Sequence, residues 1–132
     1  MNRVFVDTSA LYSLVRADDP DHERVEDCFK RHEARLVTSN FILDELLTLV
    51  KVRLGHRVAV RVGNNLRAGG DIEVVRILPE DEDSGWEFFE KQRDKDYSFT
   101  DCTSFALMRR MGIILAIATD HHYKQAGFSQ EP

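Results

Sequence analysis

The stretch RVFVDTSALYSLVR, residues 3–16, runs directly from a strand pattern into a helical pattern. Residues 3–7 combine β-branched and aromatic side chains, as a short buried strand does, and Ser9–Arg16 place apolar residues at helical spacing. Asp7 lies at the junction, and DDPD, residues 18–21, breaks the chain after the helix. The stretch therefore predicts a first β-to-α unit.

Strand and helix patterns continue to alternate beyond this unit. Further helices are predicted to begin at Asp21, at Ser39 or Asn40, at Pro79 and at Ser98, and further strands to cover Arg35–Thr38, residues 72–78 and residues 114–118. The segment RVAVRV, residues 57–62, fits both periods, and we favour a helix that Gly69 and Gly70 end. Strands that alternate with helices form parallel sheets with right-handed crossovers. We therefore predict an α/β fold, a three-layer sandwich whose central parallel sheet of about four or five strands is covered by helices on both faces.

The chain has 132 residues, of which 42% are hydrophobic, and this size suits a single domain spanning residues 1–132. No apolar run approaches the roughly 20 residues of a membrane span, and the start, MNRVFVD, lacks the apolar region of a signal peptide. We therefore expect no membrane association and a cytoplasmic location.

Cys28 and Cys102 form no CxxC motif and no Cys/His ligand spacing, so we expect two buried free thiols.

One segment is strongly basic although the formal net charge of the chain is −5. That net charge argues against indiscriminate nucleic-acid binding by the whole surface. No acid occurs between Leu46 and Gly70, where the basic residues are Lys51, Arg53, His56, Arg57, Arg61 and Arg67. On a helix Arg57 and Arg61 share a face, so this segment, with Arg53, is a candidate RNA-binding surface. A solvated basic face explains the same pattern equally well.

Four acids occupy positions where a functional site of an α/β protein would form. Asp7 follows the apolar run VFV, Asp120 follows ILAIAT, Asp101 opens the amphipathic run DCTSFALM, and Glu45 lies inside the apolar run FILDELLTLV. In an open α/β sheet, ligands bind outside the carboxyl ends of the strands, so residues from such junctions can converge. A ring of carboxylates is a site for hard divalent cations, and such sites typically act on phosphates.

Each acid also has a structural interpretation. Asp7 and Asp120 are good helix caps, and Asp101 completes a capping box with Ser98. Glu45 is harder to explain in this way, because its helical neighbours are Phe41, Ile42, Thr48 and Leu49. Burying a lone carboxylate in such a stripe is costly unless another group compensates its charge.

Other polar residues near these acids are expected to have structural roles. Asp44, next to Glu45, is expected to be an ordinary exposed acid. His121 and His122 are able to ligate metal, but surface hydrogen bonding is the more common role for histidines at a helix start. The acidic run EDED, residues 80–83, is expected to complement the positive end of its helix.

Taken in order, these segments resemble the PIN-domain family over the whole chain. The resemblance rests on VFVDTSAL, on an acid in the helix after the second strand, on YSFTDCTSFALM and on IATDHHYKQAGF. The small size and SFTDCTSFALM resemble, more narrowly, the VapC-like toxin ribonucleases of type II toxin and antitoxin pairs. The chain departs from the family pattern at FSQEP, its last residues, which leave little room for the final edge strand of many relatives. The fifth strand therefore stays open.

The resemblance implies a Mg²⁺- or Mn²⁺-dependent endoribonuclease. The family's acids fall on Asp7, Glu45, Asp101 and Asp120, with Thr8, Ser9 and Thr119 as nearby hydroxyl residues. Asp7, Glu45 and Asp101 would hold one ion, while Asp120 would help hold a second ion or orient the attacking water. The resemblance also implies a homodimer and a small antitoxin that occludes the cleft. The alternative is a catalytically silent PIN-like module that binds RNA or a partner protein.

Overall fold

Five parallel strands form one sheet in the computed structural model, which describes residues 2–132. The strands are β1 (Arg3–Val6), β2 (Arg35–Ser39), β3 (Ile72–Val75), β4 (Leu115–Ile117) and β5 (Ser129–Glu131). Their order across the sheet is β3-β2-β1-β4-β5, and every neighbouring pair is parallel. The predicted α/β class is confirmed, and the short segment at the end of the sequence does form a fifth strand.

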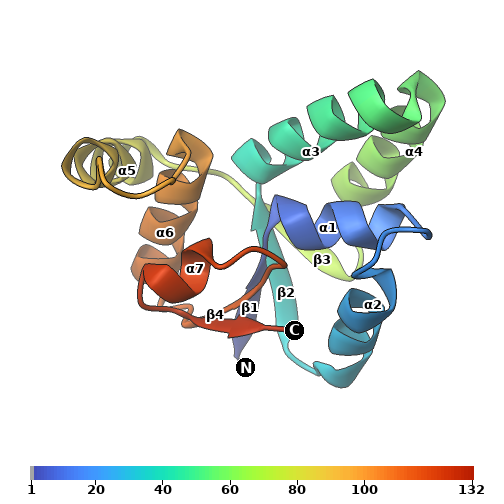
Figure 1. The fold of residues 1–132 in the computed structure, drawn as a ribbon, viewed down its shortest axis with the longest axis horizontal. Coiled ribbons are helices and arrows are strands. Elements are labelled where there is room, and N and C mark those ends of the chain that lie inside the picture. Colours follow the sequence, from blue (N-terminus) through green and yellow to red (C-terminus); the bar gives the residue numbers. More distant parts are fainter. Residues whose placement is uncertain (1) are drawn as a thin grey trace.

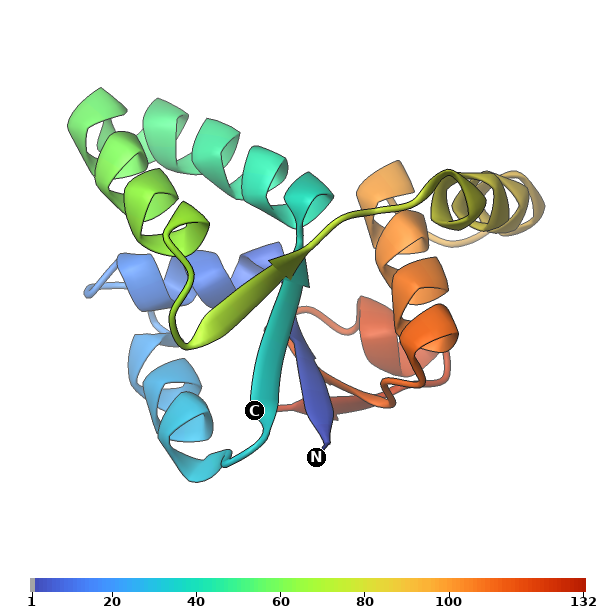
Figure 2. The same ribbon diagram turned by 180° about the vertical axis from the view of Figure 1, so that it is seen from behind.

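The helices of the described residues cover both sides of this sheet. They are α1 (Thr8–Val15), α2 (His22–Arg31), α3 (Asn40–Leu54), α4 (His56–Arg67), α5 (Pro79–Lys91), α6 (Phe99–Met111) and α7 (His122–Gln125). Helices α1 to α4 lie on one side of the sheet and α5 to α7 on the other (Figure 1), an arrangement also seen from behind (Figure 2). The three-layer prediction is therefore confirmed.

The position of β1 in the sheet decides where a ligand can bind. From β1 the chain moves outward through β2 to β3, then crosses back to place β4 on the other side of β1. Strands β1 and β4 are in register, with Phe5 opposite Ala116 and Val6 opposite Ile117. Helices diverge at such a reversal and leave a crevice outside the carboxyl ends of the two strands. Asp7 and Asp120 follow these two strand ends.

The central strands are apolar because helices exclude water from both of their faces. Phe5 and Val6 of β1 are fully buried. The ring of Tyr123, on α7, lies 6.1 Å from that of Phe5 and 5.2 Å from that of Phe105, on α6, measured between centroids. This aromatic contact packs α6 and α7 against the middle of the sheet and so supports the carboxyl end of β1.

Several element boundaries differ from the prediction. The strand predicted over residues 72–78 ends at Val75, because the N–H of Ile77 donates to Asn40 Oδ1 at 2.7 Å and leaves the sheet. Asp21 flanks α2 as predicted, but its carboxylate accepts from Arg24 and caps no backbone N–H. Ser39 is the cap of α3, since its Oγ accepts from Ile42 N at 3.1 Å. RVAVRV is helical as predicted, within α4.

The cysteines and the hydropathy of the helices match the sequence-based expectations. Cys28 and Cys102 are both free thiols and both buried. Among the described residues, no helix combines the length and the apolar character that crossing a membrane requires.

Asp81 in the EDED run does more than complement the end of its helix. Only 2% of this residue is exposed, and its Oδ2 accepts from Leu78 N at 2.8 Å. Arg110, on α6, donates to both carboxylate oxygens, at 2.7 Å from Nε and 2.9 Å from Nη2. The two-point contact links the start of α5 to the end of α6.

Helices α5 and α6 approach so closely that a glycine is needed at the contact. A Cβ atom on Gly85 would lie 3.0 Å from Thr103 N and 3.1 Å from Thr103 Cα. Both of these atoms belong to the backbone of α6, which is buried at this point and cannot easily withdraw. Because Asp101 lies two residues before Thr103, this packing also positions the start of α6.

We predict that Gly85→Ala lowers the stability of the protein. Alanine favours a helix over glycine by about 1 kcal/mol, but overpacking a rigid contact costs about 1–3 kcal/mol. The control is Gly63→Ala in α4, where the added Cβ would meet only the end of the flexible Leu47 side chain, at 3.3 Å. Urea unfolding should show Gly63→Ala to be neutral or stabilising and Gly85→Ala to be destabilising. Equal stability of the two variants would contradict close packing at Gly85.

Candidate active site

Five acids, four of them predicted from the sequence and the fifth Asp96, line one open pocket outside β1 and β4. The pocket has a volume of about 410 Å³ and is lined by Asp7, Thr8, Ser9, Glu45, Leu49, Asp96, Tyr97, Ser98, Asp101, Asp120 and His122. All four carboxylates predicted from the sequence, together with Thr8 and Ser9, therefore lie around one space.

Asp7 is the most buried of the four acids and is held on both of its oxygens. Only 3% of the residue is exposed. Its Oδ1 accepts from the hydroxyl of Tyr123 at 2.7 Å, and its Oδ2 accepts from Ser9 N at 3.2 Å and Ser9 Oγ at 2.8 Å. Burial, with the nearby charge of Asp120, raises the pKa of Asp7 to about 6 although these hydrogen bonds oppose the rise.

Glu45 reaches the pocket from the first half of α3. It is half-buried, and its Oε1 accepts from the hydroxyl of Thr8 at 2.5 Å. That hydroxyl compensates part of the cost of placing a carboxylate in an apolar stripe, while burial still raises the pKa of Glu45. Asp44 is exposed, as predicted.

Asp101 is both a helix cap and a pocket acid. It accepts at Oδ2 from Ser98 N at 3.0 Å, and Ser98 Oγ accepts from Asp101 N at 2.9 Å, which completes the predicted capping box. Burial raises the pKa of Asp101, and the hydrogen bond from Ser98 acts in the opposite direction. The capping contact involves one of the two carboxylate oxygens, Oδ2. Asp101 can therefore serve both as a helix cap and as an acid of the pocket.

Asp120 and His122 form the side of the pocket that follows β4. Asp120 Oδ1 accepts at 3.0 Å from the backbone N–H of His122, the first residue of α7. His122 Nδ1 is buried, lies 3.2 Å from Asp101 Oδ2 and 3.6 Å from Asp120 Oδ1, and makes no geometrically acceptable hydrogen bond. The interpretation of His122 as a surface residue is therefore wrong, whereas His121 is exposed as expected.

The remaining predicted site residues lie outside the pocket lining. Thr119 donates its backbone N–H to Ser9 Oγ at 3.0 Å, so it supports a pocket residue through its main chain. Arg53, Arg57 and Arg61 are exposed and do not line the pocket.

Two supporting residues were missed in the sequence. Tyr123 was not singled out, because a buried aromatic beside an apolar strand normally signals only core packing. Gln130, on β5, donates from Nε2 to the backbone carbonyls of Ala118 and Asp120 and so holds the loop that carries Asp120. Neither contact leaves a local sequence signal, since Tyr123 donates to the side chain of a distant residue and Gln130 donates to irregular backbone at least ten residues away.

The pocket suits a divalent cation. Burial raises the pKa of Asp7, Glu45 and Asp101, and the acids repel one another, which is the electrostatic condition that a bound cation relieves. Within residues 2–132, no three of these acids bring ligand atoms within 4.8 Å of one another. Together, the sheet and the pocket define an α/β protein with a carboxylate-lined candidate site for a divalent cation at the reversal point.

Comparisons with known proteins identify the family. A model of the PIN domain matches residues 4–129. The 23S rRNA-specific endonuclease VapC20 of Mycobacterium tuberculosis is 36% identical over 125 residues, which cover 95% of each chain. Ribonuclease VapC26 of the same organism is 27% identical over 93% of this chain and 90% of that protein.

Solved structures agree with this result. The crystal structure of VapC20, described as a sarcin–ricin loop cleaving toxin, has a TM-score of 0.91 and 35% identity, covering 98% of this chain and 99% of that one. The DNA-bound VapBC complex of Salmonella typhimurium has a TM-score of 0.74 and 14% identity, covering 99% of this chain and 98% of that one. This likeness shows that the two chains share a fold.

The chain belongs to the PIN-domain family, in its VapC-like group, as the sequence motifs predicted. Nucleases of this family use divalent metal ions, which agrees with the carboxylate pocket.

We predict that Asp7→Asn stabilises the metal-free protein at neutral pH. The pKa of Asp7 is about 6 in the folded protein against 3.8 for an ordinary aspartate, so the folded state binds more protons between these values. The contribution of Asp7 to stability therefore falls as the pH rises from about 4 to about 6. Asparagine cannot ionise and is also a good cap, so the variant should be about 2 kcal/mol more stable at pH 7.5 and no more stable at pH 4.

Urea unfolding in the presence of EDTA at both pH values measures this difference. The control is Asp44→Asn, which makes the same substitution at an exposed acid outside the pocket. A stability gain for Asp7→Asn that stays the same at pH 4 and pH 7.5 would contradict the assigned titration.

Proposed function

We propose that this chain is an endoribonuclease that hydrolyses RNA phosphodiester bonds with Mg²⁺ or Mn²⁺ and acts as the toxin of a toxin and antitoxin pair. The observation that carries the proposal is the convergence of Asp7, Glu45, Asp101 and Asp120 on one pocket. The likeness to a 23S rRNA-specific endonuclease, with 36% identity over 95% of the chain, supports it.

The carboxylates divide into a holding group and a positioning group. Asp7, Glu45 and Asp101 would hold one cation, and Asp120 would help hold a second or orient the attacking water. A bound divalent cation supplies an activated water and offsets charge on the phosphoryl oxygens. Thr8 orients Glu45, Ser9 and Tyr123 orient Asp7, and Ser98 orients Asp101, so the acids are fixed before RNA binds.

The proposed substrate is 23S rRNA, at the sarcin–ricin loop. VapC20 carries both descriptions, and its structure aligns with almost the whole of this chain at 35% identity. Ribosomal RNA as substrate places the proposed activity in the cytoplasm.

We predict that the purified protein cleaves ribosomal RNA with Mn²⁺ and that Asp101→Asn abolishes this cleavage. Asparagine can keep the capping contact with Ser98 but removes the negative charge that a cation requires. Primer extension across 23S rRNA in purified ribosomes measures the cleavage and its position. Circular dichroism provides the folding control and should show a normal helical content for the variant.

The outcome also separates the proposed enzyme from a silent PIN-like module. If the parent protein binds rRNA but does not cleave it with any divalent ion, the silent module is favoured. Cleavage by Asp101→Asn at the rate of the parent would instead leave Asp101 as a cap alone.

The basic segment is proposed to contact the RNA backbone outside the pocket. Arg57 and Arg61 are exposed on α4, which packs beside α3, the helix that carries Glu45. Arg53, near the end of α3, lies with its guanidinium carbon 5.9 Å from the ring centre of Tyr12. These cations would follow phosphates that extend beyond the cleavage site.

Arg57→Ala combined with Arg61→Ala is predicted to weaken RNA binding and to flatten its dependence on salt. Losing about two phosphate contacts reduces the logarithmic salt slope by about 2 at most, while cleavage at saturating RNA should continue. Filter binding at several salt concentrations measures both quantities. An unchanged affinity and slope would support a solvated basic face with no contact to RNA.

The proposed protein partners are a small antitoxin and a second copy of the chain. An antitoxin would act by occluding the carboxylate pocket, which is open to solvent. For the second copy, the structure offers an aromatic surface formed by Phe41, Trp86, Phe89 and Phe99. Trp86 is 53% exposed and Phe89 is 38% exposed, and clustered exposed aromatics are typical of protein interfaces.

Trp86→Arg is predicted to convert a homodimer into a monomer. Placing a charge in the middle of a self-complementary apolar contact brings two like charges together across the two-fold axis. Light scattering coupled to size-exclusion chromatography measures the mass. The control is Ile114→Arg, which changes another exposed apolar residue, 73% exposed and located just before β4. An identical mass for both variants would contradict this interface.

A further inference from the structure

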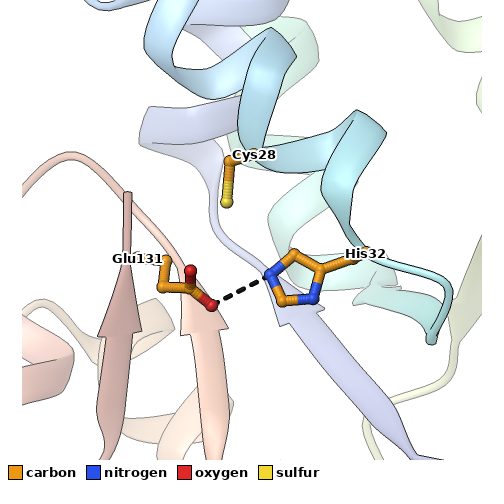
Figure 3. Close-up of side chains that lie close together, drawn as sticks. All are labelled: Cys28, His32 and Glu131. Carbon is orange, nitrogen blue, oxygen red and sulfur yellow. Dashed lines mark hydrogen bonds and ion pairs between the residues drawn. The ribbon is translucent and has the colours of Figure 1, made fainter.

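A second group of metal-binding side chains lies outside the active site. Cys28, on α2, and His32, directly after it, face Glu131, on β5, and the three side chains point toward one another (Figure 3). Each offers one ligand atom, and these atoms all lie within 4.8 Å of one another. Among the described residues, no other group of three or more such side chains meets this distance. None of the three residues lines the carboxylate pocket.

The local sequence contains part of this arrangement. Cys28 and His32 are four residues apart, and because His32 directly follows the last residue of α2, the two side chains lie near the same side of the helix end, at a spacing that suits two ligands of one metal. The conclusion that neither cysteine has a Cys/His ligand spacing is therefore wrong for Cys28. Glu131 could not be assigned from sequence, since it joins the pair only because β5 forms beside β4.

The three donors match zinc better than the ions proposed for the active site. A thiolate, an imidazole and a carboxylate are all common Zn²⁺ ligands, whereas Mg²⁺ and Mn²⁺ prefer oxygen. Tetrahedral Zn²⁺ places its donors about 3.3–3.6 Å apart, given bonds of about 2.0–2.3 Å. His32 Nε2 and Glu131 Oε2 are already 2.9 Å apart, so only a small movement of the side chains is needed. One thiolate and one carboxylate would also balance the charge of the ion.

We propose that Cys28, His32 and Glu131 form a Zn²⁺ site, with water as the fourth ligand. The site is separate from the proposed catalytic function and does not depend on it. Its ligands come from α2, from the residue that follows α2 and from the last strand, so a bound ion would fasten β5 to the layer of helices that contains α2.

The charge of the site without metal is already partly compensated. Arg31 Nη2 lies 3.4 Å from the second oxygen of Glu131, and the Arg31 side chain is 61% exposed. Burial raises the pKa of the Cys28 thiol, while Arg31 acts in the opposite direction. Arg31 can therefore swing into solvent when a cation takes over its role.

The site also connects structurally to the carboxylate pocket. Neighbouring residues of a strand point to opposite sides, so Glu131 faces the metal ligands while Gln130 holds the backbone of Ala118 and Asp120. An ion that fastens β5 would therefore also support the loop that carries Asp120.

Cobalt substitution tests the proposal in the full chain. Co²⁺ bound by a thiolate gives a sulfur-to-cobalt charge-transfer band, which a site made only of carboxylates cannot produce. Titration of the metal-free, reduced protein with Co²⁺ should produce this band with a stoichiometry of one, and Zn²⁺ should remove it. Cys28→Ser should lose the band, whereas Cys102→Ala, Arg31→Gln and Asp101→Asn should keep it.

Glu131→Gln and His32→Gln provide a test that does not depend on the folding of the Cys28 variant. Each removes one donor near the surface and should weaken Zn²⁺ binding by at least about tenfold in competition with a chelating dye. The absence of the band in the parent, its survival in Cys28→Ser, or an unchanged Zn²⁺ affinity in both of these variants would overturn the proposal. Loss of rRNA cleavage in Asp101→Asn with the band intact would separate this site from the active site.

Discussion

The rest of the structure depends on one constraint, which is to hold several carboxylates close together in a partly buried pocket. Burial and mutual repulsion both disfavour their charges, and the pKa of Asp7 rises to about 6 as a result. The surrounding residues offset this cost with hydroxyl groups, since Tyr123 and Ser9 donate to Asp7 and Thr8 donates to Glu45. The electrostatic repulsion that is left over destabilises the folded protein at the pocket. A cation bound among these carboxylates would relieve that repulsion.

Helix starts explain how these acids reach the pocket. Asp7 caps α1, Asp101 completes the capping box of α6, and Asp120 accepts from the first N–H of α7. In a parallel α/β sheet the positive ends of the helices lie near the carboxyl ends of the strands, so capping carboxylates gather on that side. Capping is thus confirmed for Asp7 and Asp101, and the cation binding that we propose would use the same side chains.

Residues far from the pocket keep its walls in place. Asp81 and Arg110 connect α5 to α6, and Gly85 lets the two helices meet near Thr103, two residues after Asp101. On the other side, Gln130 of β5 holds the loop before α7. The start of α6 and the end of β4 are therefore each supported by an element that contributes no carboxylate to the pocket.

The sequence by itself determined the α/β class, most of the helices and strands, and the four acids, because periodicity and strand-to-helix junctions are local properties of neighbouring residues. It also determined the family, since its motifs occur in a fixed order along the chain. Only the tertiary structure decided that β5 pairs with β4, that His122 turns inward between two acids, and that Tyr123 donates to Asp7. The same holds for Glu131, which meets Cys28 and His32 only across the assembled fold. These contacts join side chains whose proximity depends on strand order and helix packing, and neither leaves a pattern among adjacent residues.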